Sequence, residues 1–136
     1  MSGLLKRRFC IVGLGLLGGT YAMCLKRLGC RVTAVDIDEK AICWAKEHGV
    51  IDEGAAGAPE ALLSGADVVV LGLYPGAMVE WVRAYAAHLR PGTLLTDVCG
   101  VKGAVVGPVQ ALLPPGVEFI ACHPMAGREE GGVWNA

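Results

Sequence analysis

The feature that most constrains the fold of this chain is its alternation of short apolar runs with longer segments of helical periodicity. The runs "CIVGL", "VVVLGL" and "EFIAC" are almost wholly apolar, which is typical of strands that are covered on both faces of a parallel sheet. Between such runs, apolar residues recur at the spacing of amphipathic helices. The alternation therefore predicts an α/β fold, a doubly wound parallel sheet with helices on both faces.

The same pattern gives approximate bounds for each element. In chain order, and with the third one short, we expect strands at Arg8–Gly13, Arg31–Asp36, Val50–Asp52, Asp67–Leu73, Thr93–Asp97 and Val117–Cys122. We expect helices at Leu16–Leu28, Glu39–Glu47, Pro59–Leu63, Ala77–His88 and Lys102–Leu113.

Length and charge limit the kinds of partner. A chain of 136 residues suffices for one domain with its own core, so we assign residues 1–136 to a single domain. The net charge is −1 and both signs are scattered along the chain, so we expect no nucleic-acid partner and no membrane partner. A small-molecule ligand is the expectation that remains.

The cysteines indicate a reduced protein. There are six, none of them in a CxxC pair, and most lie inside apolar runs. We therefore expect them to be packing residues of a cytoplasmic protein, with no disulfide and no metal site.

The segment "KRRFCIVGLGLLGGTYAMCL" has a second interpretation, because a basic start before an apolar run is also typical of a signal peptide or a membrane helix. Four glycines interrupt the run, at Gly13, Gly15, Gly18 and Gly19. Each would weaken a helix by up to ~1 kcal/mol relative to alanine. The glycine spacing favours a loop with a specific ligand instead.

That loop is "GLGLLG", which directly follows the first expected strand and opens the first expected helix. In this position the first glycine permits a tight turn, the second lets the backbone approach a pyrophosphate, and the third lets helix and strand pack closely. The motif predicts a Rossmann-type dinucleotide-binding domain. The residues expected to bind the cofactor here are Gly13, Leu14, Gly15, Leu16, Leu17 and Gly18.

The second expected strand, "RVTAVD", ends on Asp36, with Ile37 next to it. A carboxylate at this point accepts hydrogen bonds from the ribose hydroxyls of an adenine nucleotide. The 2′-phosphate of NADP would meet two acids, Asp36 and Asp38, so we expect NAD to be the cofactor. The alternative is that Asp36 only caps the helix that follows it.

Three later strand ends are expected close to this loop. A doubly wound sheet binds its ligand outside the carboxyl ends of its strands, where the strand order reverses between the first and fourth strands. The fourth strand runs into Leu73, Tyr74 and Pro75, which we expect to form a loop beneath the nicotinamide. The fifth leads to Lys102, which either reaches an anionic substrate or is a solvated surface lysine. The sixth ends beside His123.

Three motifs, "VGLGLLGG", "TDVCGVK" and "HPMAGREEGG", occur in this order along the chain. Together they resemble the prephenate and arogenate dehydrogenase family of tyrosine biosynthesis, and the resemblance covers essentially the whole chain. The "HPMAG" segment is the most specific of the three.

The resemblance implies NAD-dependent oxidative decarboxylation of prephenate or arogenate. Hydride leaves the carbinol carbon for NAD, the ring carboxylate leaves as carbon dioxide, and the ring becomes aromatic. His123 would accept the hydroxyl proton, since its ordinary pKa of ~6.5 leaves it mostly neutral in the cytoplasm. A histidine alone is more often structural, so this role depends on the motif. The substrate-binding residues implied are Lys102, Gly127 and Glu129, the last of which is alternatively a surface glutamate.

The family normally continues into a helical second domain that forms the homodimer and supplies an arginine for the substrate's side-chain carboxylate. We expect this chain to be a fragment without that domain. It also has Gly100 where many family members have a serine. Two other functions remain open: another NAD(P)-dependent reductase of the β-hydroxyacid dehydrogenase type, and a non-catalytic nucleotide-binding module.

Overall fold

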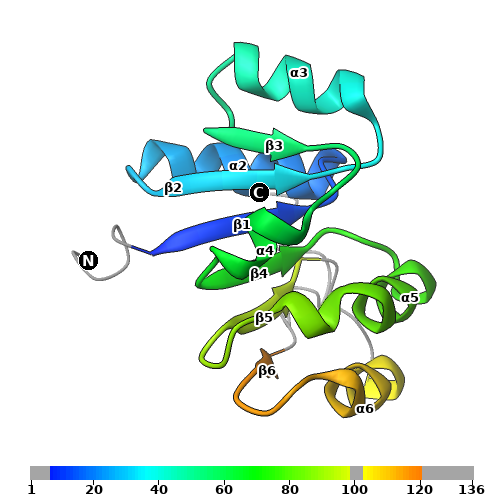
Figure 1. Ribbon diagram of the computed structural model, residues 1–136. Helices are drawn as coiled ribbons and strands as arrows, with labels where there is room; N and C mark the ends of the chain where they lie inside the picture. The colour runs from blue at the N-terminus through cyan, green and yellow to red at the C-terminus, as the bar shows by residue number, and fades with distance from the viewer. Residues whose placement is uncertain (1–6, 99–102, 121–136) are drawn as a thin grey trace, which may run out of the picture.

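A computed structural model describes residues 7–98 and 103–120 of the chain. Its centre is a six-stranded, wholly parallel sheet with strand order β3-β2-β1-β4-β5-β6 (Figure 1). The strands are β1 (Arg8–Val12), β2 (Arg31–Val35), β3 (Glu53–Ala55), β4 (Val68–Leu71), β5 (Leu94–Asp97) and β6 (Glu118–Ile120). The helices are α2 (Leu16–Arg27), α3 (Glu39–Glu47), α4 (Glu60–Ser64), α5 (Pro75–Tyr85), the short 3₁₀ turn η1 (Ala86–His88) and α6 (Gly103–Leu112).

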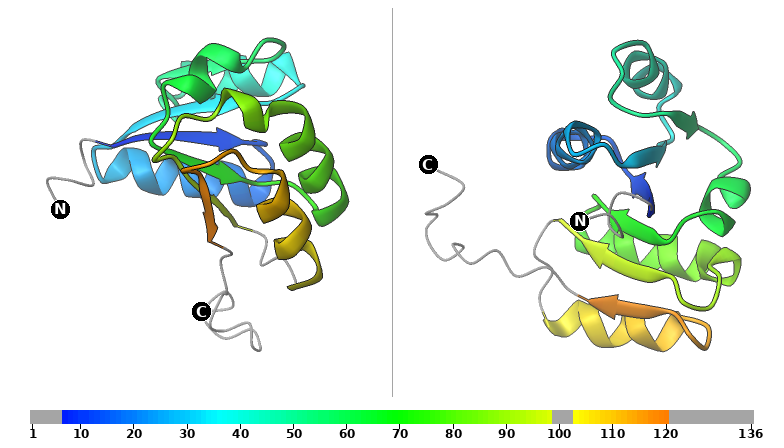
Figure 2. Two further views of the ribbon diagram at one scale, coloured as in Figure 1. Left: turned by 60° about the horizontal axis from the view of Figure 1, so that its bottom comes forward. Right: turned by 90° about the vertical axis from the view of Figure 1, so that its left-hand side faces the viewer.

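Helices cover both faces of the sheet, as the views in Figure 2 show. On β1, Phe9 and Ile11 belong to a buried cluster with α2 and α3. The alternate residues Cys10 and Val12 belong to a second cluster with α4, α5 and α6. Because successive side chains of a strand point to opposite faces, a strand between two helical layers must be apolar at every position. The predicted doubly wound parallel sheet is confirmed.

The shortest strand lies further along the chain than predicted. We expected a strand at Val50–Asp52, but β3 begins at Glu53 and pairs with β2. Val50 and Ile51 are instead buried beneath α3. The Asp52 carboxylate accepts hydrogen bonds from Lys26 Nζ at 2.7 Å and from the backbone N–H of Val32 at 2.8 Å. Val50 and Ile51 therefore pack against the helical layer, and the pairing of β3 with β2 begins only after them.

The segment after β4 is also helical earlier than predicted. We expected a loop through Tyr74 and Pro75 and a helix from Ala77, but α5 begins at Pro75, with Tyr74 as its N-cap. Proline suits the first helical position because its fixed φ matches the helix and its missing N–H has no partner there. The loop between β4 and α5 is therefore limited to residues 72–74, and Pro75 belongs to the helix.

The cysteines divide into two kinds. Cys10 and Cys30 are buried, as expected of packing residues, whereas Cys24 and Cys43 are exposed. The packing interpretation is wrong for this second pair, because α2 and α3 each turn one face to the solvent and these residues lie on it. Cys99 and Cys122 lie outside the described residues. Among the residues that the structure does describe, no helix has the length and apolar character needed to cross a membrane.

Candidate nucleotide-binding site

The carboxyl ends of β1, β2 and β4 are joined to one another by backbone hydrogen bonds. The N–H of Gly13 donates to the Val35 carbonyl at 2.8 Å, and the N–H of Gly72 donates to the Val12 carbonyl at 2.7 Å. β1 and β4 are neighbours in the sheet although they are far apart in the chain. The site thus begins where the strand order reverses, which is the position that binds nucleotides in sheets of this kind.

The glycines of the loop after β1 meet different neighbours. Gly13 has a φ of +93°, and a Cβ built on it would lie 2.7 Å from the Gly72 carbonyl oxygen. A Cβ on Gly18 would overlap the carbonyl oxygen of Gly13. Only at Gly15 is there open space, with no atom within 4 Å of a built Cβ. Packing therefore explains Gly13 and Gly18, whereas Gly15 leaves room for a ligand to approach the backbone.

The loop leads into the first turn of α2, and Gly15 is the N-cap of that helix. No side chain caps this helix end, and no acidic residue lies in its first turn. Free N–H groups and the positive end of the helix dipole favour an anion at such a place. The local charge and the open backbone thus suit a pyrophosphate group.

Asp36 lies at the end of β2 beside this loop. Its carboxylate accepts hydrogen bonds from the backbone N–H of Leu14 at 2.7 Å and from that of Asp38 at 2.8 Å. The alternative that Asp36 caps the next helix is wrong, because the N-cap of α3 is Asp38, whose side chain accepts from the Lys40 N–H. Each carboxylate oxygen can accept a further hydrogen bond. Asp36 therefore holds the glycine loop and still has acceptor capacity.

A pocket of about 440 Å³ opens beside Asp36, between the strand ends and α5. Its lining includes four of the predicted cofactor residues: Gly13, Asp36, Ile37 and Leu73. The opposite wall comes from one face of α5 and was not predicted from the sequence: Ala77, Glu80, Trp81, Ala84 and Tyr85. The signal was present, since these positions recur every three or four residues.

The pocket wall formed by α5 is ordered by its own side chains. The rings of Trp81 and Tyr85 are in contact, with centroids 5.3 Å apart. Glu80 adds a second carboxylate to the pocket, and its ion pair with Arg83 is long, at 4.0 Å, and solvent-exposed. The pocket is thus apolar with two acidic groups, and no lysine or arginine of residues 7–98 and 103–120 lines it.

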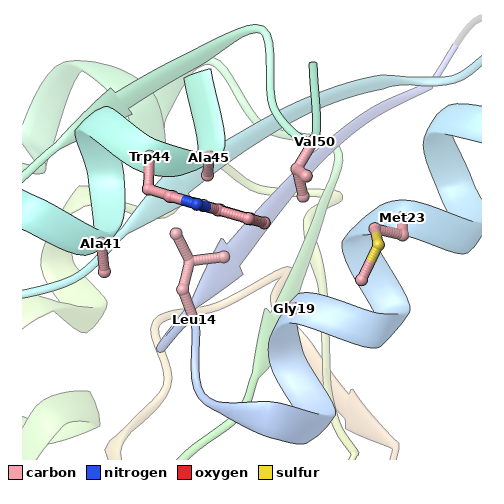
Figure 3. Close-up of a pocket in the computed structure, with 7 residues that line it drawn as sticks. All are labelled: Leu14, Gly19, Met23, Ala41, Trp44, Ala45 and Val50. Atoms are coloured by element: carbon pink, nitrogen blue, oxygen red, sulfur yellow. The ribbon is translucent and has the colours of Figure 1, made fainter. Parts of the chain in front are cut away.

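Other predicted cofactor residues do not line this pocket. Leu14 lies on the other side of the loop, in a groove between α2 and α3 (Figure 3). Leu16 is 86% exposed and Tyr74 is 83% exposed, while Leu17 is also exposed. Pro75 is the first residue of α5. These residues border the same edge of the sheet without meeting one another in the pocket.

The residues predicted to carry the chemistry cannot be placed in this way. Lys102, His123, Gly127 and Glu129 lie outside the described residues. Within residues 7–98 and 103–120, no group of three or more histidine, cysteine, aspartate or glutamate side chains is arranged to hold a metal ion.

The sequence of the chain matches a known family over residues 21–136. That family is described as "Prephenate dehydrogenase, nucleotide-binding domain". This chain belongs to it. The resemblance to this family is therefore confirmed, and the matched range contains the second and third of the three motifs.

Individual members of the prephenate dehydrogenase family agree with the assignment. Prephenate dehydrogenase of Bacillus subtilis is 30% identical over 131 residues, which are 95% of this chain and 35% of that protein. A prephenate dehydrogenase from A. aeolicus, solved with hydroxyphenyl propionate and NAD⁺, superimposes with a TM-score of 0.78 at 29% identity, over 92% of this chain and 44% of its own. Synechocystis arogenate dehydrogenase gives 0.77 at 29% identity, over 90% and 42%. The chain thus spans about a third of the length of the curated relative and less than half of each structure.

Proposed function

We propose that this chain is the NAD-binding part of a prephenate or arogenate dehydrogenase, which oxidatively decarboxylates its substrate in tyrosine biosynthesis. The observation that carries the proposal is the combination of open backbone at Gly15 with the Asp36 carboxylate beside it, in a chain of this family. The proposal extends to a homodimer of the longer protein, acting in the cytoplasm.

NAD is the cofactor that suits these residues. The backbone at Gly15 and the first turn of α2 would hold the pyrophosphate, and Asp36 would accept hydrogen bonds from the adenine ribose. The adenine would lie in the apolar pocket against α5. When bound, NAD supplies the hydride acceptor. Among the described residues, two carboxylates and no cation line the pocket, so the 2′-phosphate of NADP would be repelled there.

Within this proposal, the substrate lies at the nicotinamide end of the site. His123 accepts the proton of the substrate hydroxyl as hydride leaves, and Lys102, Gly127 and Glu129 bind the substrate. Loss of carbon dioxide makes the ring aromatic, so the chain's main tasks are to orient the carbinol and to accept its proton. The family membership and the "HPMAGREEGG" motif support these roles.

Titration calorimetry of this chain with NAD and with NADP tests the cofactor. We expect NAD to bind more tightly than NADP. We expect Asp36→Asn to weaken NAD binding about tenfold and to reduce the difference in affinity between the two cofactors. Asp67→Asn is the matched control, because the Asp67 carboxylate accepts a hydrogen bond from the Arg8 N–H at the amino ends of the strands, away from this site. Equal affinity for both cofactors, or an unchanged preference in Asp36→Asn, would contradict the assignment.

A further inference from the structure

A second groove lies between α2 and α3, on the face of the sheet opposite to α5. Figure 3 shows the Trp44 ring lying across it above Leu14, with Met23 and Gly19 on the facing side. Val50 closes one end. The groove has a volume of about 260 Å³ and an almost wholly apolar lining. It is separate from the nucleotide pocket, with which it shares no lining residue.

The floor of the groove contains a glycine that packing does not explain. Gly19 lies inside α2, where glycine costs about 1 kcal/mol relative to alanine. A Cβ built on it would have only one neighbour within 4 Å, the Leu14 carbonyl oxygen at 3.7 Å, which is an ordinary contact. Gly18 has a packing reason and Gly15 faces the nucleotide, but Gly19 has neither. Its effect is to keep the groove open.

The walls of the groove are apolar side chains left in water. Trp44 is 53% exposed and Met23 is 41% exposed. The Trp44 ring stacks on His48 with centroids 4.1 Å apart, and His48 Nδ1 bonds to the Trp44 carbonyl oxygen at 2.8 Å. The tryptophan is therefore held in place on one side and free to contact a ligand on the other. Aromatic rings and methionine sulfur both pack well against an aromatic ring.

One end of the groove is cationic. Met23 and Val50 also line an adjoining hollow that is bordered by Lys26, Arg27 and His48. The Lys26 ammonium is already paired with Asp52 at 2.7 Å. Arg27 is exposed, and no carboxylate pairs with it in the part of the chain that the structure describes. A guanidinium in this position can bind a carboxylate through two parallel hydrogen bonds.

We propose that this groove is a binding site for a small aromatic carboxylate with one ring. The ring lies over Gly19 between Trp44 and Met23, and the carboxylate pairs with Arg27. The size agrees, because a cavity of roughly 150 Å³ takes a benzene ring and this groove leaves room for a short side chain. The site is distinct from that of the nucleotide, so a ligand binds here whether or not NAD is present.

Titration of this chain with 3-phenylpropionate tests the proposal, followed through the indole N–H resonance of Trp44. We expect saturable binding with a dissociation constant of about 1 mM, unchanged by excess NAD. The uncharged 3-phenylpropionamide and the ringless propionate should each bind at least about tenfold more weakly. Equal binding of the amide, displacement by NAD, or no saturable binding overturns the proposal. A failure of NAD itself to bind would overturn the proposed function but not this site.

Two substitutions test where the ring and the carboxylate of the ligand bind. Gly19→Leu fills the groove with a good helix former, so the chain should melt no lower while 3-phenylpropionate binding falls about tenfold or more. Arg27→Gln should weaken the carboxylate about tenfold and leave the amide unchanged. Arg83→Gln is the matched control, because Arg83 is also an exposed arginine and lies on the opposite face of the sheet, in α5. Full binding in Gly19→Leu, or equal losses in Arg27→Gln and Arg83→Gln, overturns the proposal.

Discussion

The glycines of the loop between β1 and α2 differ in what surrounds them, and this difference predicts two different kinds of defect. Gly18→Ala places a methyl group against the Gly13 carbonyl, so it should lower the free energy of unfolding by about 1–3 kcal/mol. A Cβ on Gly15 would meet no described atom within 4 Å; Gly15→Ala should therefore cost only the poorer N-cap, less than about 1 kcal/mol of unfolding free energy, while NAD affinity falls about tenfold or more. Urea denaturation and calorimetry on both variants separate the two effects. A stable Gly18→Ala, or a Gly15→Ala with full NAD affinity, would contradict this reading of the loop.

Cysteine reactivity should follow burial. Burial raises the pKa of the Cys10 thiol to about 11, against a small opposing effect of its hydrogen bond with Thr33. The thiolate is the reactive form, so Cys10 should stay unmodified by N-ethylmaleimide at neutral pH, as should the buried Cys30. The exposed Cys24 and Cys43 should react readily. Mass spectrometry of peptides from the labelled native chain checks this, with urea-unfolded chain as the control. Labelling of Cys10 as fast as Cys24 would contradict the burial of β1.

The Asp52 carboxylate connects three elements. It accepts hydrogen bonds from Lys26 of α2 and from the Val32 N–H of β2, and Asp52 directly precedes β3. Burial alone would raise the pKa of its carboxyl. The hydrogen bonds from Lys26 and the Val32 N–H, with the charges of Lys26 and Arg31, outweigh that effect and hold the pKa below its usual value. A lowered pKa in the folded state gives stability above the unfolded-state pKa that is lost as the pH falls through the folded one.

Asp52→Asn should therefore lower the free energy of unfolding by about 1–2 kcal/mol at pH 7. The difference from the parent chain should shrink below about pH 4. Urea denaturation across this pH range measures both. Glu53→Gln is the control, because its ion pair with Arg31 is 3.9 Å long and exposed and should contribute little. If the difference in unfolding free energy between the parent chain and Asp52→Asn stays constant down to pH 2, the negative charge of Asp52 does not have this role.

How far the sequence predicts these elements depends on whether periodicity or tertiary contact decides them. The apolar runs predict β1, β2 and β4 to within one or two residues, because burial on both faces strongly favours apolar residues along most of each strand. Periodicity cannot tell an apolar pair under a helix from one in a strand, so β3 was placed too early. Asp36 lines the pocket at the strand ends, but its hydrogen bond from the Leu14 N–H depends on a turn that no local pattern shows. The α5 wall of the pocket was missed although the expected helix, Ala77–His88, contains all its residues, because helical periodicity does not show which helix face lies beside the strand ends.

At the scale of the whole molecule, the described residues include those proposed for the nucleotide, whereas those proposed for the substrate lie outside them. Prephenate carries two carboxylates, whereas the residues proposed to bind it in this chain include a single cationic side chain, Lys102. We expect this chain to bind NAD yet to turn over prephenate or arogenate at a negligible rate, since an unpaired substrate carboxylate loses both affinity and orientation. The absorbance of NADH measures it, with a form extended to the length of the relatives as the comparison. Equal rates in the two forms would show that residues 1–136 supply the missing charge.

The mutual contact of Gly13 and Gly72 limits how this sequence can change. A Cβ on Gly13 would strike the Gly72 carbonyl, and a Cβ on Gly72 would lie 2.9 Å from the Gly13 carbonyl. Each obstacle is a backbone atom, which every amino acid possesses. No second substitution can therefore rescue either position by shrinking a side chain, as happens in an apolar core. In a search for suppressors, the two glycines should behave as fixed points of the sequence, and only changes that move a whole strand could restore the fold.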